Sequence, residues 1–291
     1  MAAVTAPAER TFHRGFSSVQ TRELVVRYVL LVLVLALTVG PFLWQLSTSL
    51  KGPADDVYSA TPQLIPRDPT FANFVEAATK VPILQFALNS VLVAVLVVGG
   101  NVIGCTMAGY ALARLRFRGR GVVLAAIFGT MLLPAESTIV AQYLTVRSFG
   151  LSDHLLGVAL PGMVGMINIL LMRAAFMAVP KELDEAALVD GANVWQRFWR
   201  VGLPNARGMV AVISVFAFIA AWDDFLWPLL VLTTPERFTL TVGLQYLSGA
   251  FSSNPRVIAA GTMIAFIPIV VFFLVLQKQF FKGVDAGAIK G

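Results

Sequence analysis

Side chains that commonly do chemistry are few in this sequence and are widely spaced. Cys105 is the single cysteine and lies in an apolar run, so no intramolecular disulfide can form. The two histidines, His13 and His154, have no Cys, Asp or Glu at metal-ligand spacing around them. No G-x-x-x-x-G-K-S/T loop is present to cradle nucleotide phosphates. We therefore expect no catalytic residue, no metal site and no cofactor bound by this chain.

Three carboxylates lie inside or beside long apolar runs, where a charge is costly and is often functional. They are Glu136, Asp223 and Asp224. One interpretation is that they line an outer vestibule that receives a polar solute. The other is that they lie at the level of lipid headgroups, paired with residues such as Arg147. The sequence leaves both open, and the three carboxylates are candidates for a solute pathway.

Amide and aromatic side chains in the apolar runs are also ambiguous. Amides can bind a solute hydroxyl, but they also join helices to each other in membranes, and we favour the second interpretation. Aromatic rings near a membrane surface commonly form an interfacial belt, which is the favoured interpretation for Trp227. The amides are Asn89, which we keep as a pathway candidate, Asn101, Gln142 and Asn168.

A polar segment from residue 177 to 208 separates two apolar runs and has the signals of a short capped helix. Pro180 suits the first turn, and acidic residues after it complement the positive end of the helix dipole. Gly191 suits the stop. We expect a helix of about ten residues outside the membrane. From spacing alone it could equally be a connector that rests on the bilayer surface.

The same segment resembles the EAA motif of the permease subunits of ATP-binding-cassette (ABC) importers, E-A-A-x-x-D-G-A followed downstream by L-P. The matching residues are Glu185, Ala186, Ala187, Asp190, Gly191, Ala192, Leu203 and Pro204. Asn89-Ser90, the stretch from Trp222 to Pro228 and the tail from Gly287 to Gly291 resemble the carbohydrate-importer branch, such as the smaller membrane subunit of the maltose importer. Two positions depart from the family pattern, Asp223, where Asn is common, and Gly208, where a second proline is common.

The resemblance implies a non-catalytic membrane subunit that translocates a sugar or oligosaccharide by alternating access. The implied partners are a second homologous permease, two ATPase subunits that bind ATP and Mg, and an extracytoplasmic binding protein. The matching EAA residues would dock on the ATPase, and the tail at 283–291 would reach between the two ATPase subunits. The loop with Gly249, Ser252 and Asn254 would contact the binding protein. The sugar itself is not specified by the sequence.

The elements that position these residues are membrane helices. The chain of 291 residues is 57% hydrophobic and 13% charged, with a mean hydropathy of +0.78. A hydrocarbon core of about 30 Å needs roughly 20 helical residues, and a barrel strand would alternate in polarity. We predict an all-α, six-span permease fold. The six spans are expected near 26–48, 84–107, 122–142, 155–176, 209–232 and 257–277.

Charge distribution sets the predicted orientation. Most of the 22 Lys and Arg residues lie in the tails and loops that share one side of the membrane with the N-terminus, such as the run from Arg114 to Arg120. Both termini are therefore predicted to be cytoplasmic, and the resemblance implies the plasma membrane of a prokaryote. The expected parts are a cytoplasmic tail at 1–25, mobile over residues 1–23, a transmembrane domain at 26–282 and a cytoplasmic tail at 283–291. The Pro-rich stretch at 49–83 is expected to form an ordered, irregular outer cap.

Other functions fit the sequence less well. A secondary transporter or channel usually shows internal repeats or broken helices with ionisable groups at the midplane, and neither is evident. A membrane enzyme would need clustered His, Asp or Ser near one face, whereas the histidines are isolated. A net charge of +6 could suggest nucleic acid, but the basic residues are scattered between apolar runs. We expect a lipid bilayer and no nucleic acid as partner.

Overall fold

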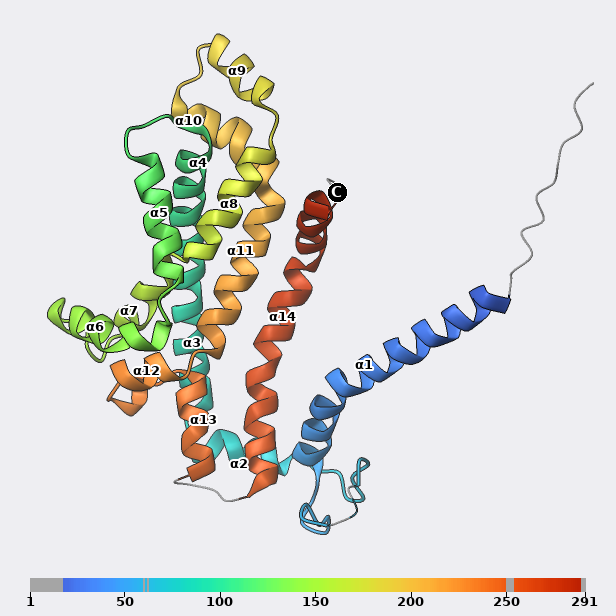
Figure 1. Cartoon of the computed structure of the whole chain (residues 1–291). Coiled ribbons are helices and arrows are strands. Elements are labelled where there is room, and N and C mark those ends of the chain that lie inside the picture. Colours follow the sequence, from blue (N-terminus) through green and yellow to red (C-terminus); the bar gives the residue numbers. More distant parts are fainter. Residues whose placement is uncertain (1–17, 60, 62, 250–253, 289–291) are drawn as a thin grey trace, which may run out of the picture.

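The computed structural model describes residues 18–59, 61, 63–249 and 254–288, and within these ranges the chain is helical with no β-strand (Figure 1). The all-α prediction is confirmed for this part of the chain. The α-helices are α1 Ser18–Leu50, α2 Ala72–Lys80, α3 Ile83–Gly100, α4 Thr106–Arg114, α5 Arg120–Met131, α6 Ala135–Ser148, α7 Leu155–Ala159, α8 Met166–Ala178, α9 Lys181–Val189, α10 Val194–Arg197, α11 Leu203–Asp223, α12 Leu226–Val231, α13 Leu240–Gly249 and α14 Pro255–Ala288. Two π-helical segments, η1 Asn101–Cys105 and η3 Phe198–Gly202, and two 3₁₀ segments, η2 Leu160–Met163 and η4 Pro235–Arg237, complete the described elements.

Two long continuous helices form the centre of the bundle. One runs from Ile83 to Arg114 through α3, η1 and α4, and the other runs from Val194 to Asp223 through α10, η3 and α11. Helix α11 packs against α3, α8 and α14, and α4 packs against α8. A Cβ at Gly109 of α4 would lie 2.6 Å from Cβ of Met172 on α8. Glycine at this position therefore permits the close approach of the two helices.

Four described helices are long and apolar enough to cross a membrane: Arg22–Leu50, Ile83–Arg114, Val194–Asp223 and Pro255–Gln277. A fifth crossing results if Leu155–Met163 and Met166–Ala178, which are bent by 42°, count as one span. Pro161 and two nearby glycines lie at this bend. These elements correspond to five of the six predicted spans. The fifth span begins earlier than predicted, since its helix already starts at Val194 and continues without a break through Gly208.

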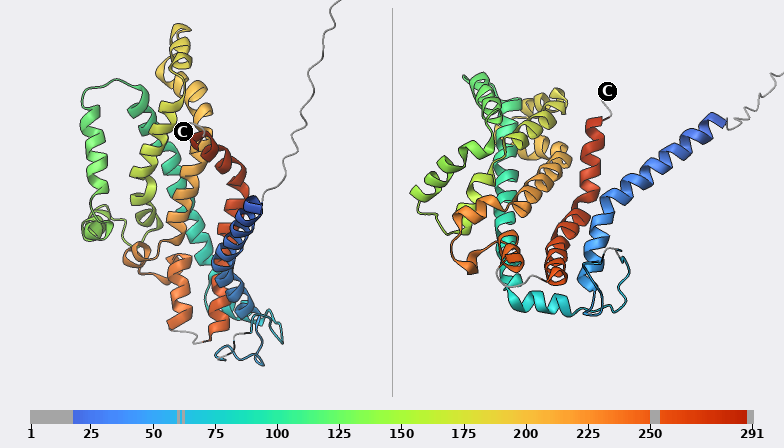
Figure 2. Two further views of the ribbon diagram at one scale, coloured as in Figure 1. Left: turned by 45° about the vertical axis from the view of Figure 1, so that its right-hand side comes forward. Right: turned by 60° about the horizontal axis from the view of Figure 1, so that its bottom comes forward.

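The third predicted span, 122–142, is not a single helix. Helix α5 ends at Met131, Pro134 is the residue before α6, and α6 runs across the direction of α5 (Figures 1 and 2). Proline lacks the backbone N–H and disfavours helical geometry in the residue before it. The apolar run therefore divides into two shorter helices at Pro134.

Helix boundaries also differ from prediction at both ends of the chain. Helix α1 begins at Ser18, so residues 18–25 of the predicted tail are helical, whereas residues 1–17 lie outside the described ranges. Helix α14 continues to Ala288, so most of the predicted tail at 283–291 has helical backbone. Helix α1 diverges from the bundle at its N-terminal end and contacts α14 near the other, where the rings of Phe42 and Phe266 are 4.7 Å apart (Figure 2).

The predicted outer cap is partly irregular and partly helical. The carboxylate of Asp55 accepts backbone N–H bonds from Arg67 and Asp68, and Arg256 of α14 donates to the Asp55 carbonyl. These bonds order the loop after α1. The end of the predicted cap instead forms helix α2, which lies across the end of the bundle opposite α9 (Figure 1).

Candidate functional site

Helix α9 and its stop form a compact capped unit at one end of the molecule (Figure 1). Pro180 precedes the helix, and Glu182 and Asp184 lie in its first turn. Gly191 has φ of +79°, and its N–H donates to the Leu188 carbonyl while the N–H of Ala192 donates to the Ala187 carbonyl. This is the Schellman pattern, which requires a left-handed residue that glycine adopts without strain. The predicted short helix and its stop at Gly191 are confirmed.

A reciprocal cap begins the next helix immediately afterwards. The side-chain oxygen of Asn193 accepts the N–H of Gln196, and the side-chain oxygen of Gln196 accepts the N–H of Asn193, each at 2.9 Å. This capping box fixes the direction in which the chain returns toward the bundle. The sequence analysis missed it, although an Asn followed three residues later by Gln is its recognised signal.

An ion pair ties α9 to the helix that follows. Asp184 and Arg197 lie 3.1 Å apart, and their side chains are 17% and 15% exposed. The hydroxyl of Tyr110 on α4 lies 3.5 Å from the other oxygen of Asp184. A pair that is this shielded from solvent is weakened less by salt than a surface pair. Asp184 therefore anchors α9 to the membrane helices instead of facing outward.

An aromatic cluster lies beneath this ion pair. The rings of Tyr110, Phe176 and Phe198 come from α4, α8 and η3, with Tyr110 5.3 Å from Phe176 and 5.2 Å from Phe198 in edge-on geometry. Edge-to-face contacts of this kind add to the stabilisation from burial. A Cβ at Gly202 would lie 3.0 Å from the Tyr110 ring, so the cluster is closely packed.

Several large apolar side chains are exposed in this region, beside charged ones, although it lies at the end of the bundle. Val189 is 88% exposed, and Leu188, Trp195 and Trp199 are each between 57% and 59% exposed. Glu185 and Asp190 are also exposed. Exposed large apolar side chains are common at protein interaction sites. The sequence analysis missed the two tryptophans, because they follow the helix that carries the motif.

The structure brings most of the predicted docking residues together. Ala186 and Gly191 are exposed, like Glu185 and Asp190, whereas Ala187 is half-buried. Leu203 is half-buried and begins α11, and Pro204 follows it in the first turn. The π-helical segment η3 ends at Gly202, and Pro204 lies in the first turn of α11, where its missing N–H is tolerated.

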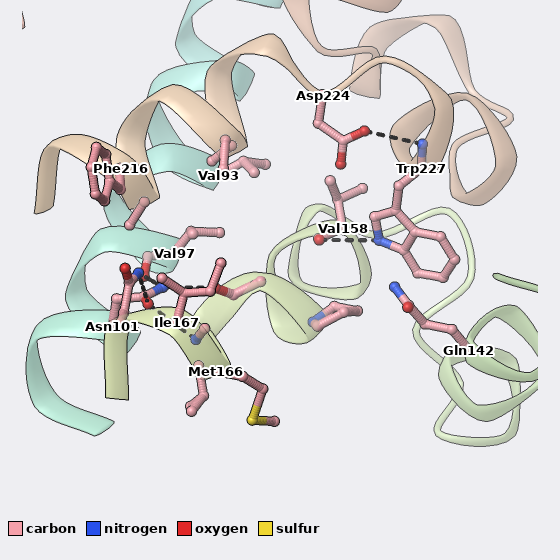
Figure 3. A pocket seen from close by; sticks show the side chains of 18 of the residues that line it. Val93, Val97, Asn101, Gln142, Val158, Met166, Ile167, Phe216, Asp224 and Trp227 are labelled. Carbon is pink, nitrogen blue, oxygen red and sulfur yellow. Dashed lines mark hydrogen bonds between the residues drawn. The ribbon is translucent and has the colours of Figure 1, made fainter. Parts of the chain in front are cut away.

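A partly open cavity of about 710 Å³ is lined by residues from several helices of the bundle (Figure 3). Its walls come from α3, η1, the end of α5, α6, the bent pair α7 to α8, and α11 with the residues after it. Most lining residues are apolar. The polar lining residues among those described are Asn101, Thr130, Gln142, Asn168 and Asp224.

Asn101 is the hydrogen-bonding centre of one cavity wall. Its amide nitrogen donates to the carbonyls of Val97 at 3.0 Å and Gly162 at 2.7 Å. Its oxygen accepts from the Gly165 N–H at 3.1 Å and from the amide nitrogen of Asn168 at 2.7 Å. The side chain therefore joins η1 to the bend before α8. This geometry supports the interhelical interpretation for Asn101 and Asn168.

The four predicted pathway residues are not gathered at one place. Asp224 lines the cavity, and one of its oxygens accepts the N–H of Trp227 at 3.2 Å. Asp223 is exposed and is not part of the cavity lining. Asn89 is buried, and its amide donates to the carbonyls of Glu236 and Phe238. Glu136 belongs to α6, but its side chain lies outside the described residues.

Trp227 is a cavity residue and is not placed as an interfacial belt residue would be. It is 7% exposed, and its indole N–H donates to the Val158 carbonyl at 3.2 Å (Figure 3). Its backbone N–H is held by Asp224. Two hydrogen bonds from different directions fix the ring at the cavity wall, which local sequence could not indicate because Val158 is far away in the chain.

Asp153 clamps two loops together near the cavity and was not identified from the sequence. Its carboxylate accepts the backbone N–H groups of Thr233 and Thr234 at 2.9 and 3.0 Å, the Thr234 hydroxyl, and the guanidinium of Arg237 at 3.0 Å. Burial raises the pKa of Asp153, but the bonds from Thr234 and Thr233 and the charge of Arg237 outweigh it and hold the pKa well below 3.8. The clamp is therefore strongest when Asp153 is ionised.

The loop proposed for a binding protein is only partly described. Gly249 ends α13, Ser252 lies outside the described residues, and Asn254 precedes α14 and accepts the N–H of Arg256 at 3.1 Å. Within the described ranges, no group of three His, Cys, Asp or Glu side chains could hold a metal ion.

Comparison with known proteins gives consistent matches across the chain. A family model described as "Binding-protein-dependent transport system inner membrane component" matches residues 100–285. The galactooligosaccharides transport system permease protein GanQ of Bacillus subtilis is 31% identical over 276 residues, which cover 92% of this chain and 96% of GanQ. The diacetylchitobiose uptake system permease protein DasC of Streptomyces coelicolor is 33% identical over 255 residues, which cover 87% of this chain and 92% of DasC.

A solved structure has the same architecture. One chain of a bacterial ABC transporter involved in the import of the acidic polysaccharide alginate superposes with a TM-score of 0.80 at 26% identity. The match covers 91% of this chain and 99% of that one.

Proposed function

The chain belongs to the binding-protein-dependent transport system inner membrane components, in their carbohydrate-importer branch, and we propose that it translocates a sugar or oligosaccharide. In this proposal an extracytoplasmic binding protein delivers the sugar, and a second homologous permease completes the pathway. Two partner ATPase subunits bind ATP and Mg and supply the energy. The chain itself is a multi-pass membrane protein, and its relatives are transport permeases and not enzymes.

The proposed topology has six crossings, with α5 as the third, in the cytoplasmic membrane of a prokaryote. Both termini and α9 would be cytoplasmic. The basic residues from Arg114 to Arg120 support this orientation, since they connect α4 to α5 at the α9 end of the bundle (Figure 1). The C-terminal end of α14 lies toward the same end.

The observation that carries the ATP-driven mechanism is the construction of α9. Its inner side is fixed to the bundle by Asp184, Arg197 and the aromatic cluster, whereas Leu188 and Val189 face outward. A helix held in this way can transmit a displacement to α4, α8 and α11 while it keeps its own contacts with the bundle. We propose that an ATPase cleft receives the outward face and that its opening and closing move the permease between states.

Gly191 offers a direct test of docking. A Cβ at this position would meet no atom within 4 Å, so the main effect of a substitution is on the backbone preference at positive φ. Asn tolerates this conformation better than a β-branched residue does. We expect Gly191→Val to reduce co-purification of the ATPase and sugar-stimulated ATP hydrolysis in vesicles severalfold, whereas Gly191→Asn keeps most of both. Glu185→Ala should reduce both while leaving the fold intact.

Gly150→Val is the matched control. Gly150 has φ of +71° and equally open surroundings, but it lies in the turn after α6. If Gly150→Val and Gly191→Val impair ATPase recruitment alike, the effect is general destabilisation and the docking role is wrong. If the native chain recruits no ATPase and transports alone, a secondary transporter becomes the better hypothesis.

A further inference from the structure

The formal charge of the cavity wall comes from a single described side chain. Among its described lining residues, Asp224 is the one with a formal charge, and no described lysine or arginine reaches the wall (Figure 3). Ligand sites of about 300–1,000 Å³ commonly hold a small organic molecule, and the volume here lies in that range. The space therefore suits a small saccharide, and its walls present negative charge to it.

Two polar side chains of the cavity, Asp224 and Gln142, keep hydrogen-bonding capacity that the described residues do not use. Asn101 is fully used by helix contacts, and Asn168 donates to it. One oxygen of Asp224 accepts the Trp227 N–H, and no bond to its other oxygen is found in the described part of the chain. The Gln142 amide likewise makes no bond to a described residue, and Figure 3 shows it facing the Trp227 ring. Saccharide hydroxyls can donate to these groups.

We propose that this cavity accepts neutral or amino saccharides and excludes acidic ones, and that Asp224 is the residue that sets this selectivity. A carboxylate among apolar walls acts through a low local dielectric, so its field is weakened less than at a surface. It attracts a protonated amino sugar, accepts bonds from a neutral one and repels a uronate. The Trp227 ring and Gln142 provide the remaining wall. The saccharide part of this inference rests on the proposed function, whereas the charge selectivity does not.

The charge selectivity can be measured on the full chain in membrane vesicles, without any transport of sugar. A cysteine is placed in the cavity by Gln142→Cys in a Cys105→Ser background, and its rates of modification by cationic and anionic methanethiosulfonate reagents are compared. We expect the ratio of cationic to anionic rate to exceed that of a free thiol by at least about fivefold. Adding Asp224→Asn should return the ratio close to that of the free thiol. Asn keeps an acceptor for the Trp227 N–H, so the substitution removes the charge and keeps this hydrogen bond.

Asp223→Asn is the control, because the neighbouring carboxylate is exposed and lies outside the cavity lining. It should leave the ratio unchanged. The proposal is overturned if Asp224→Asn has no effect, if Asp223→Asn has an equal effect, or if neither reagent reaches the cysteine in folded protein.

Uptake by the assembled importer then tests the saccharide class. Vesicles with all subunits are supplied with a neutral, an amino and a uronic disaccharide, with and without Asp224→Asn. Uptake of the uronic sugar by the native importer would overturn the proposal. If the thiol ratio behaves as expected but no sugar is imported, the charge selectivity stands and the proposed function fails.

Discussion

The α9 end and the cavity are built by opposite means. At the α9 end, side chains hold the structure: Asp184, Arg197, Tyr110 and Phe198 fix a short helix from below and leave large apolar side chains exposed. At the cavity, breaks in the backbone make the space, because α5, α7 and α11 stop or bend beside it, and Asn101 bridges the gap. The first region exposes a fixed helix, whereas the second leaves a space between helices.

Each region also contains a π-helical segment. η3 lies under α9, and η1 carries Asn101 beside the cavity. Such turns are frequent at functional sites because they shift the faces of a long helix relative to each other. The comparison predicts that the two regions respond differently to loss of a side chain.

The largest effect is expected at Asn101. Asn101→Leu removes five hydrogen bonds from a residue that is 1% exposed and leaves the Gly165 N–H and the Asn168 amide without this acceptor. We expect a loss of about 2–4 kcal/mol in the free energy of unfolding, measured by thermal unfolding in detergent. Asn205→Ala is the control, since Asn205 is exposed and bonds only to its own helix at Val201. Equal losses for the two variants would contradict the role of Asn101.

An intermediate effect is expected at Asp184. Asp184→Ala leaves Arg197 without its carboxylate in a shielded position and should cost about 1–3 kcal/mol. The comparison requires the loss to be local, so hydrogen exchange should accelerate in α9 and stay unchanged in α3. Glu76→Ala breaks an exposed pair with Lys80 and should cost under about 0.5 kcal/mol. Uniform acceleration of exchange throughout the bundle would show that α9 is not a separately anchored element.

The smallest effect on stability is expected when low pH protonates Asp153 and weakens its clamp. Since the pKa of Asp153 is lower in the folded state than its ordinary value of 3.8, the clamp stabilises the fold above about pH 4 and is lost as the pH falls. We expect the native chain to lose stability progressively as the pH falls below about 4, and we expect Asp153→Asn to lose less stability over the same range. Thermal unfolding across this pH range measures the difference. Identical pH profiles would mean that protonation of Asp153 does not affect the stability of the fold.

Local patterns in the sequence predicted the elements whose causes are local. The bounds of α9 follow from Pro180, the acidic first turn and Gly191, and the apolar runs gave the long helices. The break at Pro134 also has a local cause, but the apolar run around this single proline is long enough to be read as one span. The fifth span was expected to begin near residue 209, because the polar first turns of its helix resemble a loop.

Tertiary contacts were beyond what spacing could predict. Tyr110 and Asp184 are 74 residues apart, and Trp227 and Val158 are 69 apart, so only the fold brings them together. For the same reason the sequence could not separate Asp224, which lines the cavity, from its exposed neighbour Asp223. Asn89 was a reasonable pathway candidate from its type, but its amide is occupied by the carbonyls of Glu236 and Phe238.

The most direct test of the account is a crosslink between α9 and the ATPase. Val189→Cys in a Cys105→Ser background places one reactive thiol on α9, where Val189 is 88% exposed, and Val140→Cys places one on α6, where Val140 is 67% exposed. In membranes that contain all subunits, the account predicts that Val189→Cys crosslinks to the ATPase, with a yield that changes when nucleotide is added, and that Val140→Cys does not. A crosslink from Val140→Cys alone, or from neither position, would contradict it.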